Sequence, residues 1–255
     1  MLNHIIWDAV FAGILASLAC GLGVVPLCFK KIDNPKQIGI GYGFAGGLMF
    51  SASVYNLILP GLQMEGHQIE IVLALKVVGG ILAGTFFIWL VERYMETHES
   101  KTVENWGGKG VVLIFIAMCI HSIPEGVAVG VGYTSGELQS SSLGAYIALA
   151  IGIHNIPEGL AVAIPMRLAG MSIGRCFLMA VFTSLPQPLA AIPAVFLAWF
   201  FQPLMPSLMG FAAGAMIFLV ILEMIPDALQ QESAVKIAWA FIWGFCTMIL
   251  LQIIL

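Results

Sequence analysis

Two copies of one polar motif lie within apolar parts of the sequence. Residues 121–129 read HSIPEGVAV and residues 154–162 read HNIPEGLAV, so seven of the nine positions are identical. In each copy a histidine lies four residues before a glutamate, which places both side chains on one face of a helix. Imidazole and carboxylate groups suit zinc, iron(II) and related divalent ions. The doubled motif therefore predicts a metal site whose ligands are His121, Glu125, His154 and Glu158.

Proline and glycine surround each glutamate of the motif. Pro124 and Pro157 precede the glutamates, and a proline inside a helix leaves the carbonyl one turn earlier without its donor. Gly126 and Gly159 follow them, and glycine lets another backbone approach closely. We expect two broken helices around a common polar cavity.

Histidine and glutamate inside a helix can also serve structure alone. A single buried His–Glu pair is explained equally well as a hydrogen bond that fixes how two helices pack. Two identical pairs that face each other favour a binding site, because four such groups are costly to keep in hydrocarbon. Two carboxylates also neutralise a divalent cation, which lowers the cost of holding that ion at depth.

The composition places these motifs in a membrane. Of 255 residues, 60% are hydrophobic and 9% are charged, whereas soluble domains carry about 25% charged residues. The net charge of −4 and the lack of a basic face argue against a nucleic-acid partner. Eight apolar runs are long enough to cross a hydrocarbon core of about 30 Å, and together they form one predicted domain, 1–255. The runs cover about residues 5–29, 38–60, 69–92, 110–132, 143–165, 173–200, 204–229 and 235–255.

Positive charge alternates from one connection to the next. All Lys and Arg residues except Lys76 fall on one side of the predicted eight-span topology. Because basic connections stay in the cytoplasm, both termini are expected outside. The residues that carry this bias are Lys30, Lys31, Lys36, Arg93, Lys101, Lys109, Arg167, Arg175 and Lys236.

A second repeat relates the two ends of the chain. Residues 44–49 read FAGGLM and residues 211–216 read FAAGAM, and Pro60 and Pro226 close the two runs. The predicted topology gives these helices opposite directions. Helices 1–3 and 6–8 are therefore candidates for an inverted repeat, which is typical of alternating-access transporters. Small-residue patterns also recur in any packed membrane bundle, and this remains an alternative.

With these motifs the sequence resembles the ZIP family of divalent metal transporters, in particular its short bacterial-type members. The doubled motif, the two FAxGxM repeats and residues 223–226 (EMIP) carry the resemblance, which covers nearly the whole chain. It implies eight helices in a 3+2+3 arrangement, and zinc uptake into the cytoplasm by alternating access through a site between helices 4 and 5. It also implies Met49 as a further ligand. Fe²⁺, Mn²⁺, Co²⁺ and Cd²⁺ are further candidate cargoes.

The chain departs from the family where its better-known members hold a second metal ion. The three second-site positions are Ser122, Asn155 and Gln187 here, and all of them are neutral. We therefore expect one tightly held ion. Glu223 is the candidate for the exit path, with helix capping near Pro226 as the alternative.

Other function classes remain open on the residues alone. An intramembrane zinc hydrolase is the main alternative, since zinc with an open position can activate water. No His-Glu-x-x-His motif occurs and no separate general base is evident, so we do not expect an enzyme. A proton or monovalent-cation channel and a purely structural scaffold are further alternatives. The expected location is the inner or plasma membrane, with lipid as a partner and the oligomeric state, a homodimer included, left open.

Overall fold

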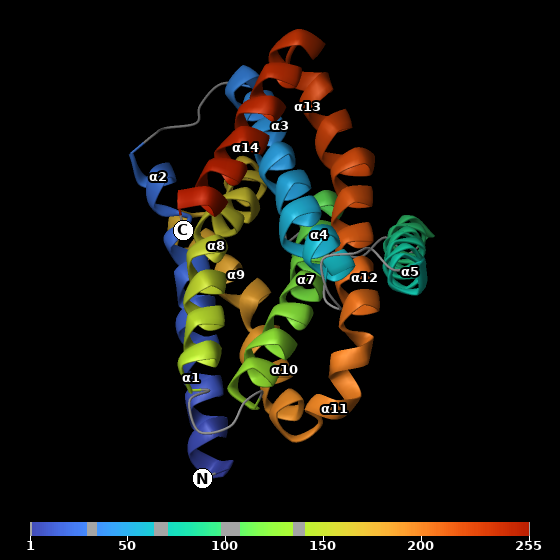
Figure 1. The fold of residues 1–255 in the computed structure, drawn as a ribbon. Coiled ribbons are helices and arrows are strands. Elements are labelled where there is room, and N and C mark those ends of the chain that lie inside the picture. Colours follow the sequence, from blue (N-terminus) through green and yellow to red (C-terminus); the bar gives the residue numbers. More distant parts are fainter. Residues whose placement is uncertain (1, 30–34, 64–70, 98–107, 135–140, 255) are drawn as a thin grey trace.

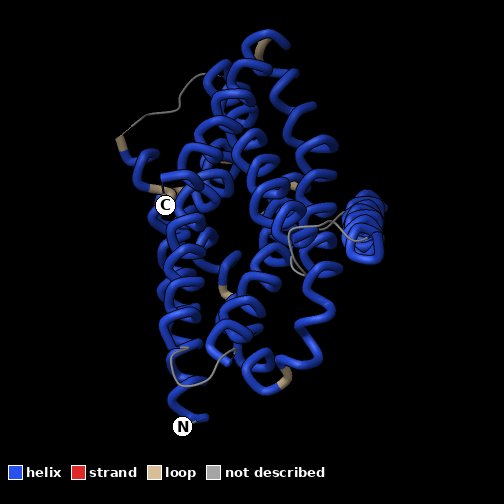
Figure 2. The backbone as a smooth tube through the Cα atoms, in the orientation of Figure 1, coloured by secondary structure: helices blue, strands red, loops and turns tan. Residues whose placement is uncertain are grey.

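A computed structural model describes residues 2–29, 35–63, 71–97, 108–134 and 141–254. Within these ranges every regular element is helical, as Figure 2 shows. Eight stretches are long and apolar enough to cross a membrane, which confirms the predicted eight-helix membrane protein. They are His4–Cys28, Gly39–Gln63, Ile71–Thr97, Lys109–Thr134, Ile147–Leu168, Ile173–Phe196, Met205–Gln231 and Ala234–Leu251.

Some spans are single helices and others are built from several segments (Figure 1). The long single helices are α1 (Leu2–Leu22), α5 (Ile71–Thr97), α7 (Lys109–Thr134), α8 (Ser141–Leu168) and α14 (Ala234–Ile254). The second span joins α3 (Pro35–Ala52), η1 (Ser53–Ile58) and α4 (Leu59–Gln63), and the seventh joins α12 (Met205–Leu219), η3 (Val220–Met224) and α13 (Ile225–Gln231). The remaining segments are α2 (Val25–Cys28), α9 (Ile173–Ser184), α10 (Pro186–Phe196), α11 (Ala198–Phe201) and η2 (Gln202–Leu204).

The prolines of the doubled motif do not break their helices. α7 continues through Pro124, and α8 continues through Pro157. The expectation of two broken helices is therefore wrong, because a membrane helix tolerates the loss of one hydrogen bond when its surroundings compensate. The sixth span is divided instead, since Leu185, two residues before Gln187, separates α9 from α10.

Two spans contain a π-helical turn at matching places. η1 and η3 each begin nine residues after the first residue of their FAxGxM repeat. The N–H of Leu59 bonds to the carbonyl of Val54, and that of Ile225 bonds to the carbonyl of Val220. This five-residue spacing is that of a π-helix, which often marks a functional site. The two repeats thus share an irregularity that their sequences alone do not display.

Glycines bring pairs of helices into backbone contact. α5 lies against α12 at the outer edge seen in Figure 1, and α3 lies against α14. A Cβ atom added to Gly84 would overlap the backbone of Phe211, and one added to Gly244 would overlap that of Phe44. Such small-residue contacts are the usual means by which membrane helices approach closely.

The motif glycines hold α7 and α8 to different neighbours. A Cβ atom at Gly126 would overlap the backbone of Gln187 on α10. A Cβ atom at Gly159 would overlap the backbone of Cys20 on α1. Each copy of the motif is thus fixed to a helix outside the motif pair, which leaves the side chains of His121, Glu125 and Glu158 to meet between α7 and α8.

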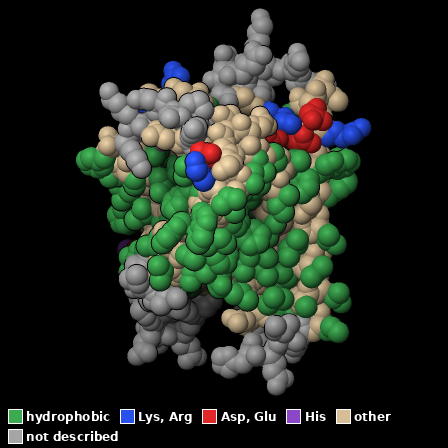
Figure 3. All heavy atoms as spheres, turned by 90° about the horizontal axis from the view of Figure 1, so that it is seen from above, with side chains coloured by type: hydrophobic (Ala, Val, Ile, Leu, Met, Phe, Trp, Pro, Cys, Tyr) green, Lys and Arg blue, Asp and Glu red, His purple; other side chains and the backbone are tan. Residues whose placement is uncertain are grey.

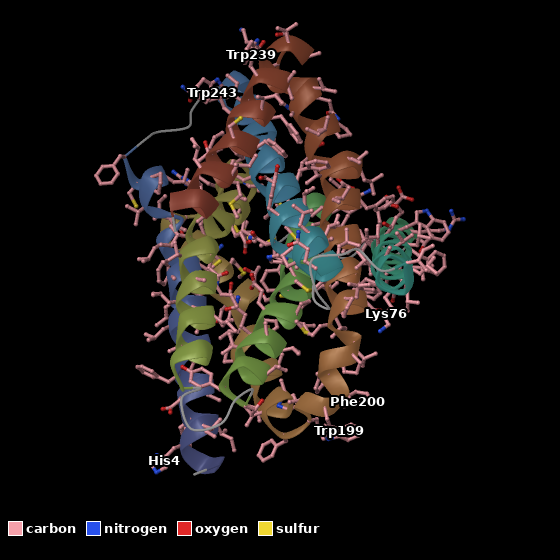
Figure 4. All side chains as sticks on the ribbon, in the orientation of Figure 1. His4, Lys76, Trp199, Phe200, Trp239 and Trp243 are labelled. Carbon is pink, nitrogen blue, oxygen red and sulfur yellow. The ribbon has the colours of Figure 1, made fainter. Side chains whose placement is uncertain are left out.

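The outer surface is apolar, as expected for contact with lipid. The face in Figure 3 shows mainly hydrophobic side chains, and its few charged ones lie in the upper half of the view. In Figure 4, Trp239 and Trp243 lie toward the end where α13 meets α14, whereas Trp199 and Phe200 lie toward the opposite end. All four are exposed. Aromatic residues at both ends of a bundle are typical of the two membrane–water interfaces.

Candidate metal site

His121, Glu125 and Glu158 meet between α7 and α8. The Nε2 atom of His121 lies 3.1 Å from Oε1 of Glu158 and 3.4 Å from Oε1 of Glu125. One ligand atom from each of the three residues lies within 4.8 Å of the others, and all three side chains are buried. The structure therefore brings three of the predicted ligands into one cluster.

The spacing of these atoms suits a small divalent ion. Ligand atoms that hold Zn²⁺ in a tetrahedron at about 2.0–2.2 Å lie roughly 3.3–3.6 Å from one another. The two measured separations, 3.1 Å and 3.4 Å, need little adjustment to match. The same separations also suit hydrogen bonds from a protonated imidazole to the carboxylates. The cluster can therefore hold either a proton or a metal ion between the same atoms.

This competition predicts weaker zinc binding in acid. Metal binding must release the protons that the ligands carry. Lowering the pH from about 7.5 to 5.5 covers the range in which histidine ordinarily gains a proton. This change should raise the zinc dissociation constant of the purified protein. Calorimetry in buffers of different ionisation enthalpy measures both the affinity and the number of protons released. Equal affinity at both pH values, with no protons released, would contradict a site built on His121.

His154 and Met49 are the two other residues predicted to bind the first metal ion. His154 lies in α8, but its side chain is outside the described part of the structure. Met49 is fully buried on α3, the helix that leads into η1. The roles of both residues as ligands stay predictions.

The predicted second-site residues form a hydrogen-bond chain instead of an open site. Gln187 donates from Nε2 to Oε2 of Glu125 and, at 3.4 Å, to Oδ1 of Asn155. Asn155 donates from Nδ2 to Oε1 of Gln187 at 3.1 Å and to the carbonyl of Ala16 at 2.9 Å. The amide of Gln187 thus occupies acceptor atoms of Glu125 and Asn155 that a second ion would need.

Ser122 has a structural role in this arrangement. Its hydroxyl is buried and lies 3.1 Å from the carbonyl of Met118 and 2.9 Å from that of Thr183. The second contact ties α7 to α9. Both neighbours are acceptors, so the hydroxyl proton is directed toward backbone rather than toward Glu125.

Glu223 lies outside the His–Glu cluster, within η3. Its Oε1 atom is 3.3 Å from Nζ of Lys109, which also lies 2.8 Å from Oε1 of Glu92 and 3.6 Å from Oε1 of Glu96. Sequence reasoning treated Lys109 only as a topology marker. The structure makes it the shared cation of three carboxylates from α5 and η3, at the end of the bundle predicted to face the cytoplasm.

A cavity approaches the cluster from the other side. It has a volume of about 280 Å³ and is lined by Asn56, Pro124, Glu125, Met205 and Met209, among others. These residues lie in the parts of their helices that the charge bias places nearer the outside. The opposite half of α7 contributes Leu113, Ile114 and Met118 to a continuous buried apolar core. The cavity beside Glu125 thus lies in the half of the bundle that is predicted to face outside.

Asn56 is a site residue that sequence reasoning missed. It lies in η1 and its Nδ2 atom is 3.4 Å from Oε1 of Glu158, the oxygen that also faces His121. A signal was present in the sequence, because Asn56 lies twelve residues after Phe44 and Glu223 lies twelve residues after Phe211. Without the π turns nothing singled out Asn56, and Glu223 was a candidate for the exit path without any link to position 56.

Comparison with known proteins places these features in a family. Residues 96–252 match the family model described as ZIP Zinc transporter. The zinc transporter GufA of Myxococcus xanthus is 32% identical over 242 residues, which cover 91% of this chain and 94% of that protein. The zinc transporter ZIPB of Bordetella bronchiseptica is 33% identical over 259 residues, with 96% and 80% covered. A relative from Arabidopsis thaliana is 39% identical over 225 residues, and the chain spans about a third (35%) of that longer protein.

Proposed function

Because this chain belongs to the ZIP zinc transporter family, we propose that it carries Zn²⁺ across a membrane into the cytoplasm through the cluster of His121, Glu125 and Glu158. Membership makes the chain a multi-pass membrane transporter of metal ions and not an enzyme, so the hydrolase alternative is not favoured. Zinc as the cargo, the direction of movement and the residues of the pathway are the parts that we propose.

The buried cluster is the observation that carries this proposal. Two carboxylates and an imidazole converge within 4.8 Å in the middle of two apolar helices. Ionised groups are expensive at such depth, so they are kept where they serve an ion or proton path. Their combined charge balances a divalent cation, and their donor atoms match the preferences of zinc.

Two features support alternating access. The cavity beside Glu125 is lined by residues from the predicted outer half of the bundle, while in the other half the ion pairs of Lys109 link α7 to α5 and η3. The matching contacts α3–α14 and α5–α12, together with the matching π turns, agree with an inverted repeat in a 3+2+3 arrangement. An inverted repeat allows the same site to open to either side in turn.

Reconstitution tests the proposal directly. Purified protein in liposomes should take up zinc along its gradient, and Mn²⁺, Fe²⁺, Co²⁺ and Cd²⁺ should be compared under the same conditions. Protein-free liposomes and liposomes with the Glu125→Gln variant are the controls. Zinc flux equal to that of protein-free liposomes, in a preparation that remains folded and monodisperse, would refute the function.

The orientation is tested by thiol labelling of intact cells. The parent protein for this experiment has the exposed Cys28 and Cys246 replaced. Single cysteines on the predicted cytoplasmic side should then be shielded from an impermeant thiol reagent, and those on the predicted outer side should react with it. The shielded set is Asn34→Cys, Thr102→Cys and Ala169→Cys, and the reactive set is Gly66→Cys and Leu138→Cys. Apart from Ala169 these positions lie outside the described residues. Labelling of the first set would reverse the topology and the direction of uptake.

The environment of the protein follows from the same proposal. The exposed apolar side chains require lipid, and a bacterial-type member would reside in the inner or plasma membrane with both termini outside. A homodimer stays a prediction, and the mass of the detergent-solubilised particle measured by light scattering would decide it.

A further inference from the structure

Asn56 touches a ligand atom of the proposed metal site. Its Nδ2 atom lies 3.4 Å from Oε1 of Glu158, and that same oxygen lies 3.1 Å from Nε2 of His121. An ion bound between His121 and Glu158 would compete with the Asn56 amide for this oxygen. If the ion displaces the amide, a half-turn of the terminal torsion of Asn56 presents Oδ1 in place of Nδ2 to the ion.

Asn56 also lies on the route to the site. It lines the cavity of about 280 Å³ together with Glu125, Met205 and Met209. A cation that enters this cavity meets one neutral amide, the phenol of Tyr55 and two thioethers, with Glu125 also in the wall. An amide oxygen is a hard ligand, whereas a thioether is a soft one. The side chain at position 56 is therefore placed to influence which ions proceed.

The matching π turns give this position a counterpart. Asn56 in η1 and Glu223 in η3 occupy the same place relative to their FAxGxM repeats. Glu223 is a carboxylate that lies 3.3 Å from Lys109, a cation that it shares with Glu92 and Glu96. The repeat thus carries an amide beside the His–Glu cluster and a carboxylate at the equivalent position in η3. Position 56 therefore differs in ligand chemistry from its counterpart, and it is the one that borders the cluster.

We propose that Asn56 is a specificity-determining residue at the entrance, where its amide is an early oxygen ligand for the arriving ion and sets the preference among divalent metals. This inference rests on the proposed transport function. It predicts that the ligand type at position 56 changes the ratio of rates for different ions, beyond any common loss of activity.

Two substitutions of Asn56, one to a harder ligand and one to a softer ligand, test this proposal. Asn56→Asp supplies a carboxylate, which suits Mn²⁺, and Asn56→Cys supplies a thiolate, which suits Cd²⁺. In liposomes, kcat/KM is measured for Mn²⁺, Zn²⁺ and Cd²⁺ with each variant. Asn56→Asp should raise the Mn²⁺/Zn²⁺ ratio about fivefold or more, and Asn56→Cys should raise the Cd²⁺/Mn²⁺ ratio by a similar factor.

Gln63 offers matched controls. It is exposed on α4 in the same span, so Gln63→Glu and Gln63→Cys make similar chemical changes away from the cavity and should leave both ratios unchanged. If each Asn56 variant changes kcat/KM by the same factor for all three ions, Asn56 has only a structural role and the inference fails. If the natural chain transports none of these ions, the proposed function itself fails, and the two failures are thereby distinguished.

Discussion

Replacing Glu158 by glutamine should reduce zinc transport at least about 100-fold, since loss of even an outer-shell partner of a metal ligand costs about 10–100-fold. The substitution keeps the shape of the side chain but removes one of the two carboxylates that face His121. A divalent ion would then be held by a single negative charge in a low-dielectric interior, where charge imbalance is most costly. Zinc-65 uptake into liposomes measures the loss, and Glu125→Gln should behave alike.

A matched control separates this effect from a general loss of charge. Glu232 pairs with Lys236 at the turn between α13 and α14, so Glu232→Gln makes the same chemical change far from the cluster and should transport normally. Size-exclusion chromatography and thermal unfolding in detergent should show all three variants folded. Undiminished zinc flux in Glu158→Gln would remove the doubled motif from the pathway.

Purified protein should hold one tightly bound zinc ion, and Gln187→Glu should create a second site. In the natural chain the amide of Gln187 donates to both Glu125 and Asn155. A glutamate cannot make these donations when ionised and would face Glu125 as a like charge, so a cation becomes the favourable occupant. Replacing a neutral ligand with a charged one contributes roughly 1.5–3 kcal/mol, which raises affinity for the second ion about ten- to a hundredfold.

Metal analysis and anomalous diffraction at the zinc edge measure this stoichiometry. Gln231→Glu is the matched control, because Gln231 is exposed on α13 and the same substitution there should leave one ion bound. Two fully occupied ions in the natural chain would show that neutral oxygens suffice. One ion in both Gln187→Glu and the natural chain would show that Gln187 does not limit the second site.

The sequence was sufficient for the number of spans and for naming three side chains that meet in the structure. Long apolar runs and a duplicated motif are local signals, and the convergence of His121, Glu125 and Glu158 follows once the two motif helices pack together. Asn56 could not be found in this way, since a π turn changes which face of a helix a residue occupies and the 3.6-residue period gives no warning of it. The direction of the Gln187 amide was hidden for a similar reason, because it depends on the break at Leu185.

Ion pairs across distant segments were also beyond sequence reasoning. Lys109 and Glu223 are separated by more than a hundred residues, and only the fold brings them within 3.3 Å. Charge counting assigned Lys109 to a side of the membrane but gave no partner. A residue that marks topology in the sequence can therefore also tie distant helices together.

The motif glycines determine which parts of the molecule could slide past one another. Gly126 and Gly159 join α7 to α10 and α8 to α1 at backbone distance, and the cluster of His121, Glu125 and Glu158 lies on two of these four helices. Where α3 meets α8, the glycine contact is with a side chain instead, since a Cβ atom on Gly41 would lie 3.0 Å from Cγ2 of Ile164. Side-chain contacts of this kind can be exchanged without separating backbones. If α8 and its partners moved along this contact with α3, the ion would move together with the side chains that bind it. It would not pass through a stationary pore.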